Sequence, residues 1–313
     1  MLASPVSYGG LSMRMYTSAV TAFFLSMALV ATADMANAQV GNNARGRNDG
    51  DNGNGNNAPT RGCRELPSHD ELRAALIAAR NQDNGGLNLD MWGTIVDRDG
   101  VVCAVAFTGS DRGDQWPGSR VISAQKASTA NAFSLPGLSL STANLYTATQ
   151  PGGSLFGLQE SNPVATDVAY SGNPGRYGQQ NDPMVGSRSG GVNVFGGGLA
   201  LYDSDGRLLG GLGVSGDTSC ADHNIAYRTR NTLELDYVPA GVAAAADPTR
   251  RDNIIFDIVP QSNGIPNPGQ MSGISGPNTV AAPGGFGHPS CHSYTGAGNN
   301  VSRGFANALP ANR

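Results

Sequence analysis

The stretch MWGTIVDRDGVVCAVAF, residues 91–107, decides the fold. Residues 91–96 and 101–107 are rich in β-branched and apolar side chains, a composition that is typical of strands. Between them, the sequence Asp-Arg-Asp-Gly supplies an aspartate that can cap a turn and a glycine that tolerates positive φ. We therefore predict a β-hairpin with a four-residue loop at residues 97–100.

A helix is expected directly after this hairpin. Pro117 and Ser119 stand where a helix begins, after a polar connection that contains Gly109. Small and apolar residues then recur at helical spacing up to Phe133. A helix packed against the hairpin is therefore the predicted core.

The same arrangement of strand, turn and strand occurs a second time. Residues 192–202 (VNVFGGGLALY) lead through Asp-Ser-Asp-Gly into residues 207–215 (RLLGGLGVS), and a helical pattern starts just after Cys220. The spacing of about a hundred residues between the two units is far too long for a solenoid array. The predicted fold class is α+β: an antiparallel sheet built from two hairpins, with packed helices and long glycine-rich loops.

Residues 1–38 have the three parts of a secretory signal peptide. Arg14 precedes an apolar stretch at 19–33, and Ala-Asn-Ala at 36–38 supplies a cleavage site before Gln39. A membrane anchor is the alternative, but the apolar run is too short to favour spanning. The mature chain is therefore expected to be periplasmic or secreted, with no membrane span after signal cleavage.

Three further segments follow from composition. Residues 39–60, which are mostly Asn and Gly, are predicted to be a disordered tether. Residues 61–259 are predicted to form the domain, with a loop insert at 150–191, and residues 260–313 an irregular C-terminal extension. The net charge is −4 and neither sign clusters, which argues against a nucleic-acid partner.

The four cysteines are expected to form two disulfides. Export places them in an oxidising compartment, where an even count favours bridges. Of the three connectivities we prefer Cys63 with Cys103, and Cys220 with Cys291. The first would fasten the chain that enters the first helix to the hairpin, and the second would fasten the C-terminal tail to the duplicate unit. A metal site is the alternative, disfavoured because the chain has no Cys-x-x-Cys pair.

The order of short motifs in the two units resembles the GlcG/HbpS family, the haem-degrading or DUF336 domain. The motifs are VDRDG at 96–100, KASTA at 126–130, YDSDG at 202–206 and GLGVSG at 211–216, followed by Asp222 and Ile225-Ala226. The insert at 150–191 and the cysteine-containing tail depart from the family pattern. The resemblance implies haem or a related tetrapyrrole as a small-molecule ligand, and a homo-oligomer formed through helices or sheet edges.

Lys126, Thr129 and Phe156 are the first candidate ligand contacts. Lys126, the only lysine of the chain, lies in the family-like motif, where its ammonium can pair with Asp97, with Asp99 or with a haem propionate. Thr129, one turn along, shares its face. A buried structural ion pair is the alternative for Lys126. Phe156, between two leucines of the insert, offers an apolar ring to a ligand, or else these three side chains simply pin the loop.

The histidines give a second candidate site. His223 follows Asp222, and the preferred Cys220–Cys291 bridge would bring His288 and His292 close to it. Three imidazoles with neighbouring carboxylates can hold a metal or ligate haem iron. A structural hydrogen-bonded cluster is the alternative.

The sequence therefore predicts an exported haem-binding protein and leaves open whether it is an enzyme. The first alternative is an exported enzyme of small organic-acid catabolism, with Lys126, Asp97 and Asp222 lining one polar pocket. The second is a structural or partner-binding module without a small ligand. The chain contains no serine nucleophile-elbow motif, phosphate loop, dinucleotide fingerprint or zinc-protease motif.

Overall fold

A four-stranded antiparallel sheet with strand order β2-β1-β4-β3 forms the centre of the fold. The strands are β1 (Trp92–Asp97), β2 (Val102–Phe107), β3 (Gly198–Tyr202) and β4 (Leu208–Ser215). Strand β1 pairs with β2 in the first hairpin, and β3 pairs with β4 in the second. The inner strands β1 and β4 also pair with each other, from Trp92 opposite Ser215 to Asp97 opposite Gly210, and so join the two hairpins. The predicted α+β sheet of two hairpins is confirmed.

This computed structural model describes residues 62–245, 247–258, 285–289, 291 and 305–313. They all lie in the unit Gly55–Arg313. The predicted signal peptide at 1–38 and tether at 39–60 fall outside the described residues, as does much of the extension at 260–313. Among the helices that are described, none has the length and apolar character needed to cross a membrane.

Both hairpin turns use the predicted aspartate chemistry. Asp97 Oδ1 accepts the backbone N–H groups of Asp99 and Val101, and Asp203 Oδ1 accepts those of residues 205 and 207. The glycine that ends each turn has a positive φ, 77° in the first and 73° in the second. Only glycine adopts this conformation at little steric cost, so the Asp-x-Asp-Gly sequence fixes both turns locally.

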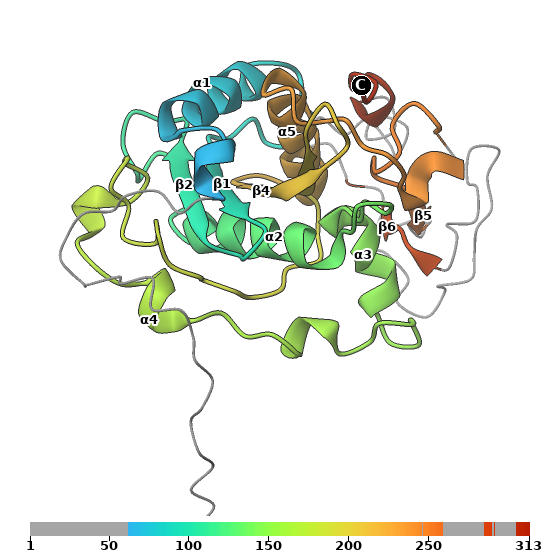
Figure 1. Cartoon of the computed structure of the whole chain (residues 1–313), viewed down its shortest axis with the longest axis horizontal. Coiled ribbons are helices and arrows are strands. Elements are labelled where there is room, and N and C mark those ends of the chain that lie inside the picture. Colours follow the sequence, from blue (N-terminus) through green and yellow to red (C-terminus); the bar gives the residue numbers. More distant parts are fainter. Residues whose placement is uncertain (1–61, 246, 259–284, 290, 292–304) are drawn as a thin grey trace, which may run out of the picture. The chain divides into compact units, whose positions relative to one another are not determined.

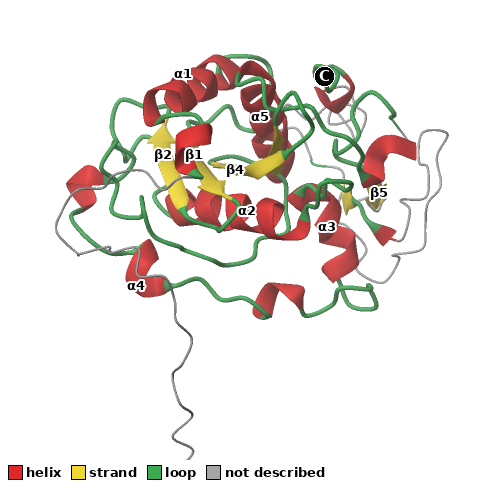
Figure 2. Cartoon of the chain, viewed as in Figure 1, coloured by secondary structure: helices red, strands yellow, loops and turns green. Residues whose placement is uncertain are grey.

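Helices cover both faces of the sheet (Figures 1 and 2). The α-helices are α1 (His69–Arg80), α2 (Ser119–Phe133), α3 (Thr142–Thr149), α4 (Thr166–Ala169) and α5 (Ser219–Thr232), and the short 3₁₀ turns are η1 (Cys63–Glu65), η2 (Leu158–Glu160), η3 (Pro174–Arg176) and η4 (Val242–Ala245). Helices α1 and α5 pack together on one face, and α2 crosses the other. A capping box formed by Ser68 and Glu71 starts α1.

The α2 face is unusually close because β4 presents glycines to it. A Cβ built on Gly211 would lie 2.3 Å from the carbonyl oxygen of Ala127, and one on Gly213 would lie 1.9 Å from that of Ser123. Any side chain at these positions would push the helix backbone away from the strand. The sequence GGLG at 210–213 therefore sets the distance between α2 and the sheet.

One predicted strand is shorter in the structure. Strand β3 begins at Gly198, because the N–H groups of residues 193, 196 and 198 bond to the side chains of Thr129, Ser219 and Thr142 instead of a neighbouring strand. Beside it, Tyr202 forms a single parallel bridge with Asp236.

Both preferred disulfides are present. Cys63–Cys103 joins η1 to β2 with Cα atoms 5.2 Å apart, and Cys220–Cys291 joins α5 to the extension with Cα atoms 6.0 Å apart. At the end of the predicted domain, β5 (Phe256–Ile258) pairs in parallel with β6 (His288–Pro289), so the described part of the extension includes a short strand. The second disulfide and this pairing hold the extension near the start of α5.

Replacing Gly213 by alanine is expected to lower the free energy of unfolding by about 1–3 kcal/mol, because the new methyl group meets helix backbone that cannot move aside freely. Urea unfolding measures the change. Gly137→Ala is the matched control, since a Cβ there meets nothing within 4 Å. Equal stability of the two variants would contradict the close α2–β4 packing.

Candidate functional site

Lys126 is buried in an ion pair with Asp222. Its Nζ lies 2.7 Å from Asp222 Oδ2 and 3.0 Å from the carbonyl oxygen of Val214, and the two side chains are 0% and 1% exposed. The ammonium also lies 4.7 Å from the centre of the Phe195 ring. The prediction of a partner at Asp97 or Asp99 was therefore wrong in its residue, because α2 aims this side chain at the start of α5 and away from the hairpin turn.

Burial dominates the electrostatics of this pair. Desolvation lowers the pKa of Lys126 and raises that of Asp222 to about 6, and the attraction between the two charges opposes both shifts. Asp222 Oδ1 also accepts the N–H of Asp217 at 2.8 Å, which fixes the turn before α5. These contacts match the alternative of a structural ion pair.

The polar pocket expected for an organic-acid enzyme does not form. Asp97 lies opposite Gly210, at the end of β4 remote from Val214, where Lys126 and Asp222 meet. Because both members of the ion pair are also sealed from solvent, the three residues do not line one pocket. This separation counts against the small organic-acid reading.

Thr129 and Phe156 have different surroundings. Thr129 is buried; its Oγ1 donates to the carbonyl of Gln125 and accepts the N–H of Asn193 at 2.9 Å, so it positions the loop before β3. Phe156 is 68% exposed, whereas its neighbours Leu155 and Leu158 pack against a buried apolar cluster. The leucines therefore pin the insert, and the phenylalanine remains accessible.

The histidine cluster forms as far as it is described. His288 Nε2 lies 2.7 Å from Ser219 Oγ, and His223 is one helical turn further along α5. His223 Nε2 lies 3.2 Å from both the N–H of Ile254, which it accepts, and Asn253 Oδ1, while its buried Nδ1 has no hydrogen-bond partner among the described residues. His292 lies outside the described residues. The cluster thus brings together two of the three predicted imidazoles.

Metal binding by this cluster is not favoured by its hydrogen bonds. Both Nε2 atoms already accept a hydrogen bond, and the sulfur atoms of Cys220 and Cys291 beside His288 form a disulfide, so they offer no thiolate. The same holds for Cys63 and Cys103. A metal site at His223, His288 and His292 stays a prediction.

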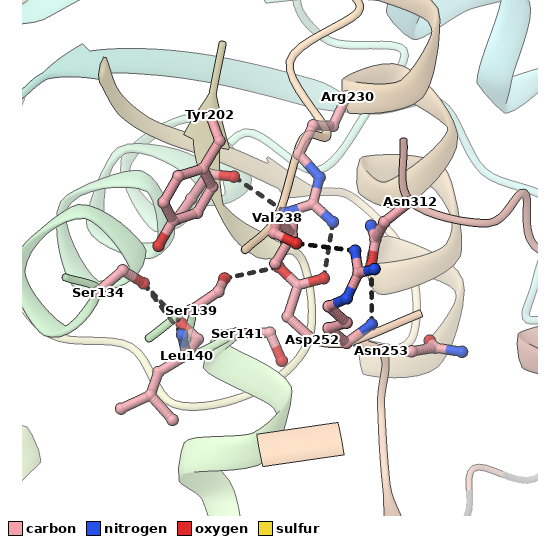
Figure 3. Close-up of polar contacts among 12 residues, drawn as sticks. Ser134, Ser139, Leu140, Ser141, Tyr202, Arg230, Val238, Asp252, Asn253 and Asn312 are labelled. Atoms are coloured by element: carbon pink, nitrogen blue, oxygen red, sulfur yellow. Dashed lines mark hydrogen bonds and ion pairs between the residues drawn. The ribbon is translucent and has the colours of Figure 1, made fainter. Parts of the chain in front are cut away.

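A second buried ion pair, between Arg230 and Asp252, fastens the segment after α5 (Figure 3). Arg230 donates two hydrogen bonds to the Asp252 carboxylate, at 2.6 and 2.8 Å, and Ser139 donates a third at 2.7 Å. Burial raises the pKa of Asp252, but the Arg230 charge outweighs it and the net shift is downward. With both oxygens engaged, this carboxylate is a structural anchor.

A cavity of about 500 Å³ opens between the β2–α2 connection and the insert, and we call it the aromatic pocket. Its lining residues are Trp92, Asp111, Arg112, Gly113, Pro117, Gly118, Arg120, Val121, Tyr170, Pro174 and Tyr177. A larger hollow of about 750 Å³ borders η1, α1 and the end of α5, but it has no aromatic lining and carries Glu65, Glu71 and Glu234. The aromatic pocket is the better candidate for a flat apolar ligand.

Arg120 builds the wall of this pocket. It forms a two-pronged ion pair with Asp182, donates to the carbonyl of Ala169 at 2.7 Å, and stacks 3.7 Å from the centre of the Tyr177 ring. The Arg120 side chain is 2% exposed, and the Asp182 carboxylate of the insert neutralises its charge. Arg120 therefore positions the pocket rather than binding a ligand.

Arg112 and Tyr170 are the accessible functional groups of the pocket. The Arg112 side chain is 48% exposed and only 3.7 Å from Asp111, a weak surface pair, and Tyr170 is 63% exposed. Trp116, next in the chain to the pocket-lining Pro117, is 51% exposed. Sequence reasoning missed this site; the only signal was aromatic residues within otherwise polar, glycine-rich segments.

The chain is similar to a known protein family and to solved structures. The family described as haem degrading protein HbpS-like matches residues 68–230, just over half of the chain. None of the curated proteins matches. Among solved structures, the crystal structure of a PduOC:heme complex is 26% identical and covers 54% of this chain and 96% of that chain, with a TM-score of 0.38. Klebsiella pneumoniae protein ORFY, of family DUF336, is 22% identical, covers 52% and 86%, and has a TM-score of 0.36.

Replacing Lys126 by methionine is expected to lower the free energy of unfolding by about 3–5 kcal/mol, because it leaves the buried Asp222 carboxylate without its cation. The double variant K126M/D222N should recover most of this loss, since asparagine still accepts the Asp217 N–H. Arg207→Met, at an exposed pair, is the control and should change stability by less than about 1 kcal/mol. The single variants K126M and D222N and the double variant are compared by urea unfolding. If the loss of unfolding free energy in the double variant equalled the sum of the two single losses, the pair would not be coupled.

The two buried histidines predict acid sensitivity. Desolvation lowers the pKa of His223 to about 3 and that of His288 to about 4, from 6.5. Between these values and 6.5 the unfolded chain binds more protons than the folded chain. Stability is therefore lost as pH falls through this window, by about 1.4 kcal/mol per pH unit for each histidine.

The variant His223→Gln isolates one of these contributions. The raised pKa of Asp222 adds a slope of opposite sign at pH 4–6, but it does so in both proteins and cancels in the comparison. The free energy of unfolding is measured in urea at several pH values from 6.5 to 4. Its slope against pH should be smaller in H223Q than in the wild type, by the equivalent of about one proton. Identical slopes would show that His223 is not held neutral by burial.

Proposed function

The chain belongs to the HbpS-like family, and we propose that it is an exported protein that binds haem or a related tetrapyrrole in the aromatic pocket. The family description, which names haem, supports the class of ligand. The arrangement of aromatic side chains around a cavity of suitable size supports the location. Haem, when bound, supplies a redox-active iron held in a flat apolar ring.

The proposal rests on one observation: the same cavity is lined by an exposed aromatic side chain and by an exposed arginine. Tyr170 is 63% exposed at the rim, Tyr177 is held flat against Arg120, and Arg112 extends beside them. Aromatic side chains favour stacking on a flat π-system, and an arginine fork matches a carboxylate such as a propionate. The residues present therefore fit a macrocycle that carries acidic groups.

The start of α2 adds to this preference for an anionic ligand. Gly118, the N-cap residue, offers no side-chain cap, and the first turn contains no acidic residue. The N–H groups of Ser119 and Arg120 bond to the carbonyl oxygens of Trp116 and Pro117, so it is the helix dipole that favours negative charge at this terminus. Tyr170 supplies a phenol oxygen, which is a known type of axial ligand for haem iron.

The earlier candidates Lys126, Thr129 and His223 are buried, so contact with haem would require the α2–α5 region to open. Phe156 is accessible, but a ligand resting on it cannot also touch the sealed Lys126. These contacts stay predictions, and variants at the same positions serve to test them against the aromatic pocket.

Export and self-association complete the proposal. The signal-peptide features of residues 1–38 support export, and two disulfides fit an oxidising compartment. N-terminal sequencing of protein recovered from the native host should then begin at Gln39, and light scattering of that protein should give a mass above that of one chain.

Titration of the disulfide-intact protein with hemin is expected to give a saturable shift of the Soret band. Tyr170→Ala should weaken binding by about tenfold, equal to about 1.4 kcal/mol, because it removes both the ring and the phenol. Tyr170→Phe should bind nearly as well yet alter the spectrum if the phenol ligates iron. Arg112→Gln should weaken binding by a few-fold at low salt, since one exposed charge pair is lost.

Phe156→Ala and His223→Gln are the matched controls and should leave the titration unchanged. Loss of binding in H223Q with full binding in Y170A would move the site to the histidine cluster. The absence of any saturable shift in the wild-type protein would remove haem from the proposal altogether.

A further inference from the structure

Ser219 and His288 form a hydroxyl–imidazole pair that the haem proposal does not use. Ser219 Oγ lies 2.7 Å from His288 Nε2, and His288 Nδ1 lies 2.6 Å from the carbonyl oxygen of Pro289. A carbonyl can only accept, so Nδ1 carries the proton and Nε2 presents its lone pair. The serine hydroxyl therefore donates to Nε2, which is the arrangement of a nucleophile and its general base with a third group orienting the base.

The surroundings hold both groups in this geometry. The N–H of Gly196 donates to Ser219 Oγ at 2.6 Å, so the serine proton is directed to the imidazole. The His288 ring packs 5.3 Å from the Tyr146 ring, and its backbone N–H bonds to Ile255 at 2.7 Å. The Cys220–Cys291 disulfide ties the residue after the serine to the short segment that carries the histidine.

The two residues of the pair differ in exposure. His288 is 2% exposed, whereas Ser219 is partly exposed. Burial lowers the pKa of His288 to about 4, so its ring is neutral at pH 7 and is a weaker base than a free imidazole.

Ser219 stands at a strand–turn–helix junction. It is the first residue of α5, three residues beyond the last glycine of the β4–α5 turn, and Thr218 caps the helix by accepting N–H groups of residues 221 and 222. The N–H of Cys220, which directly follows the serine, belongs to the first turn, whose N–H groups lack partners within the helix. A backbone N–H at that position is where a nucleophile elbow stabilises an oxyanion.

We propose that Ser219 is a nucleophile activated by His288 and that the protein carries a second activity, acyl transfer from small esters to water. Ser219 Oγ bonds to the ester carbonyl carbon, and its proton passes to His288 Nε2. The bond to the alcohol oxygen then breaks, and the alcohol leaves with the proton from Nε2. Water repeats the sequence on the acyl-serine and releases the acid, so one ester and one water give one alcohol and one acid.

This activity belongs to the chain rather than to its family. Ser219 lies inside the segment that matches the HbpS-like family, residues 68–230, but His288 lies outside it. The general base thus comes from the extension, and the disulfide is what brings it to the serine. The inference does not depend on haem binding.

An alkyl fluorophosphonate tests the nucleophile directly, because serine attack on phosphorus expels fluoride and leaves a stable adduct. The folded, disulfide-intact full chain should gain one adduct, mapped to Ser219 by peptide mass spectrometry. Ser219→Ala should gain none, and Ser161→Ala, at an exposed serine, should label as the wild type does. The same protein should release p-nitrophenol from p-nitrophenyl acetate, and S219A should lose that release.

His288→Ala should label at least about 100-fold more slowly, the contribution of a general base, and added imidazole should restore part of the rate. Imidazole rescue separates a base from a merely structural residue, and circular dichroism verifies that the variant is folded. A folded wild type with no adduct at Ser219 would overturn the proposal. So would adduct formation in folded H288A at the wild-type rate.

Discussion

The close approach of α2 to the glycines of β4 is the constraint on which the rest of the structure depends. Carbonyl groups of α2 lie close to the glycines of β4, so this part of the helix faces strand backbone rather than a thick apolar layer. Polar residues such as Ser123, Lys126 and Thr129 can therefore be fully buried and still find partners. The glycine stripe explains why the buried side of this helix is polar.

Three buried ion pairs tie distant segments to that core. Arg120 of α2 binds the insert through Asp182, Lys126 binds the start of α5 through Asp222, and Arg230 of α5 binds the later segment through Asp252. The cost of removing these charges from water offsets much of the attraction between them, so the ion pairs add little to the free energy of unfolding. Their main effect is to select one arrangement of the long loops. In the glycine-rich insert, the Arg120–Asp182 pair adds to the apolar contacts of Leu155 and Leu158 and to the backbone bonds between Val102 and residues 186 and 187.

The sequence was sufficient for features whose cause is local. The Asp-x-Asp-Gly turns and the capping box at Ser68 each specify their element within a few residues, and both are present. The disulfide pairing also followed, because each bridge had an evident chain end to fasten. These are the parts of the fold that residue type and spacing determine.

The sites were harder to predict because they depend on which segments meet in space. The partner of Lys126 could not be found from spacing, since the choice between Asp222 and the hairpin aspartates is set by the direction of α2 across the sheet. The aromatic pocket combines residues from the β2–α2 connection with tyrosines from the insert, far apart in the chain. Nothing in either segment alone indicates a cavity.

The histidine cluster was predicted from the preferred disulfide. The Cys220–Cys291 bridge does bring His288 to the start of α5. The decisive neighbour, however, is the hydroxyl of Ser219, which occupies the imidazole nitrogen that a metal would need. The Pro289 carbonyl holds the proton on Nδ1, so Nε2 is left to accept the proton of the Ser219 hydroxyl. The chemistry proposed for this end of α5 follows from that arrangement.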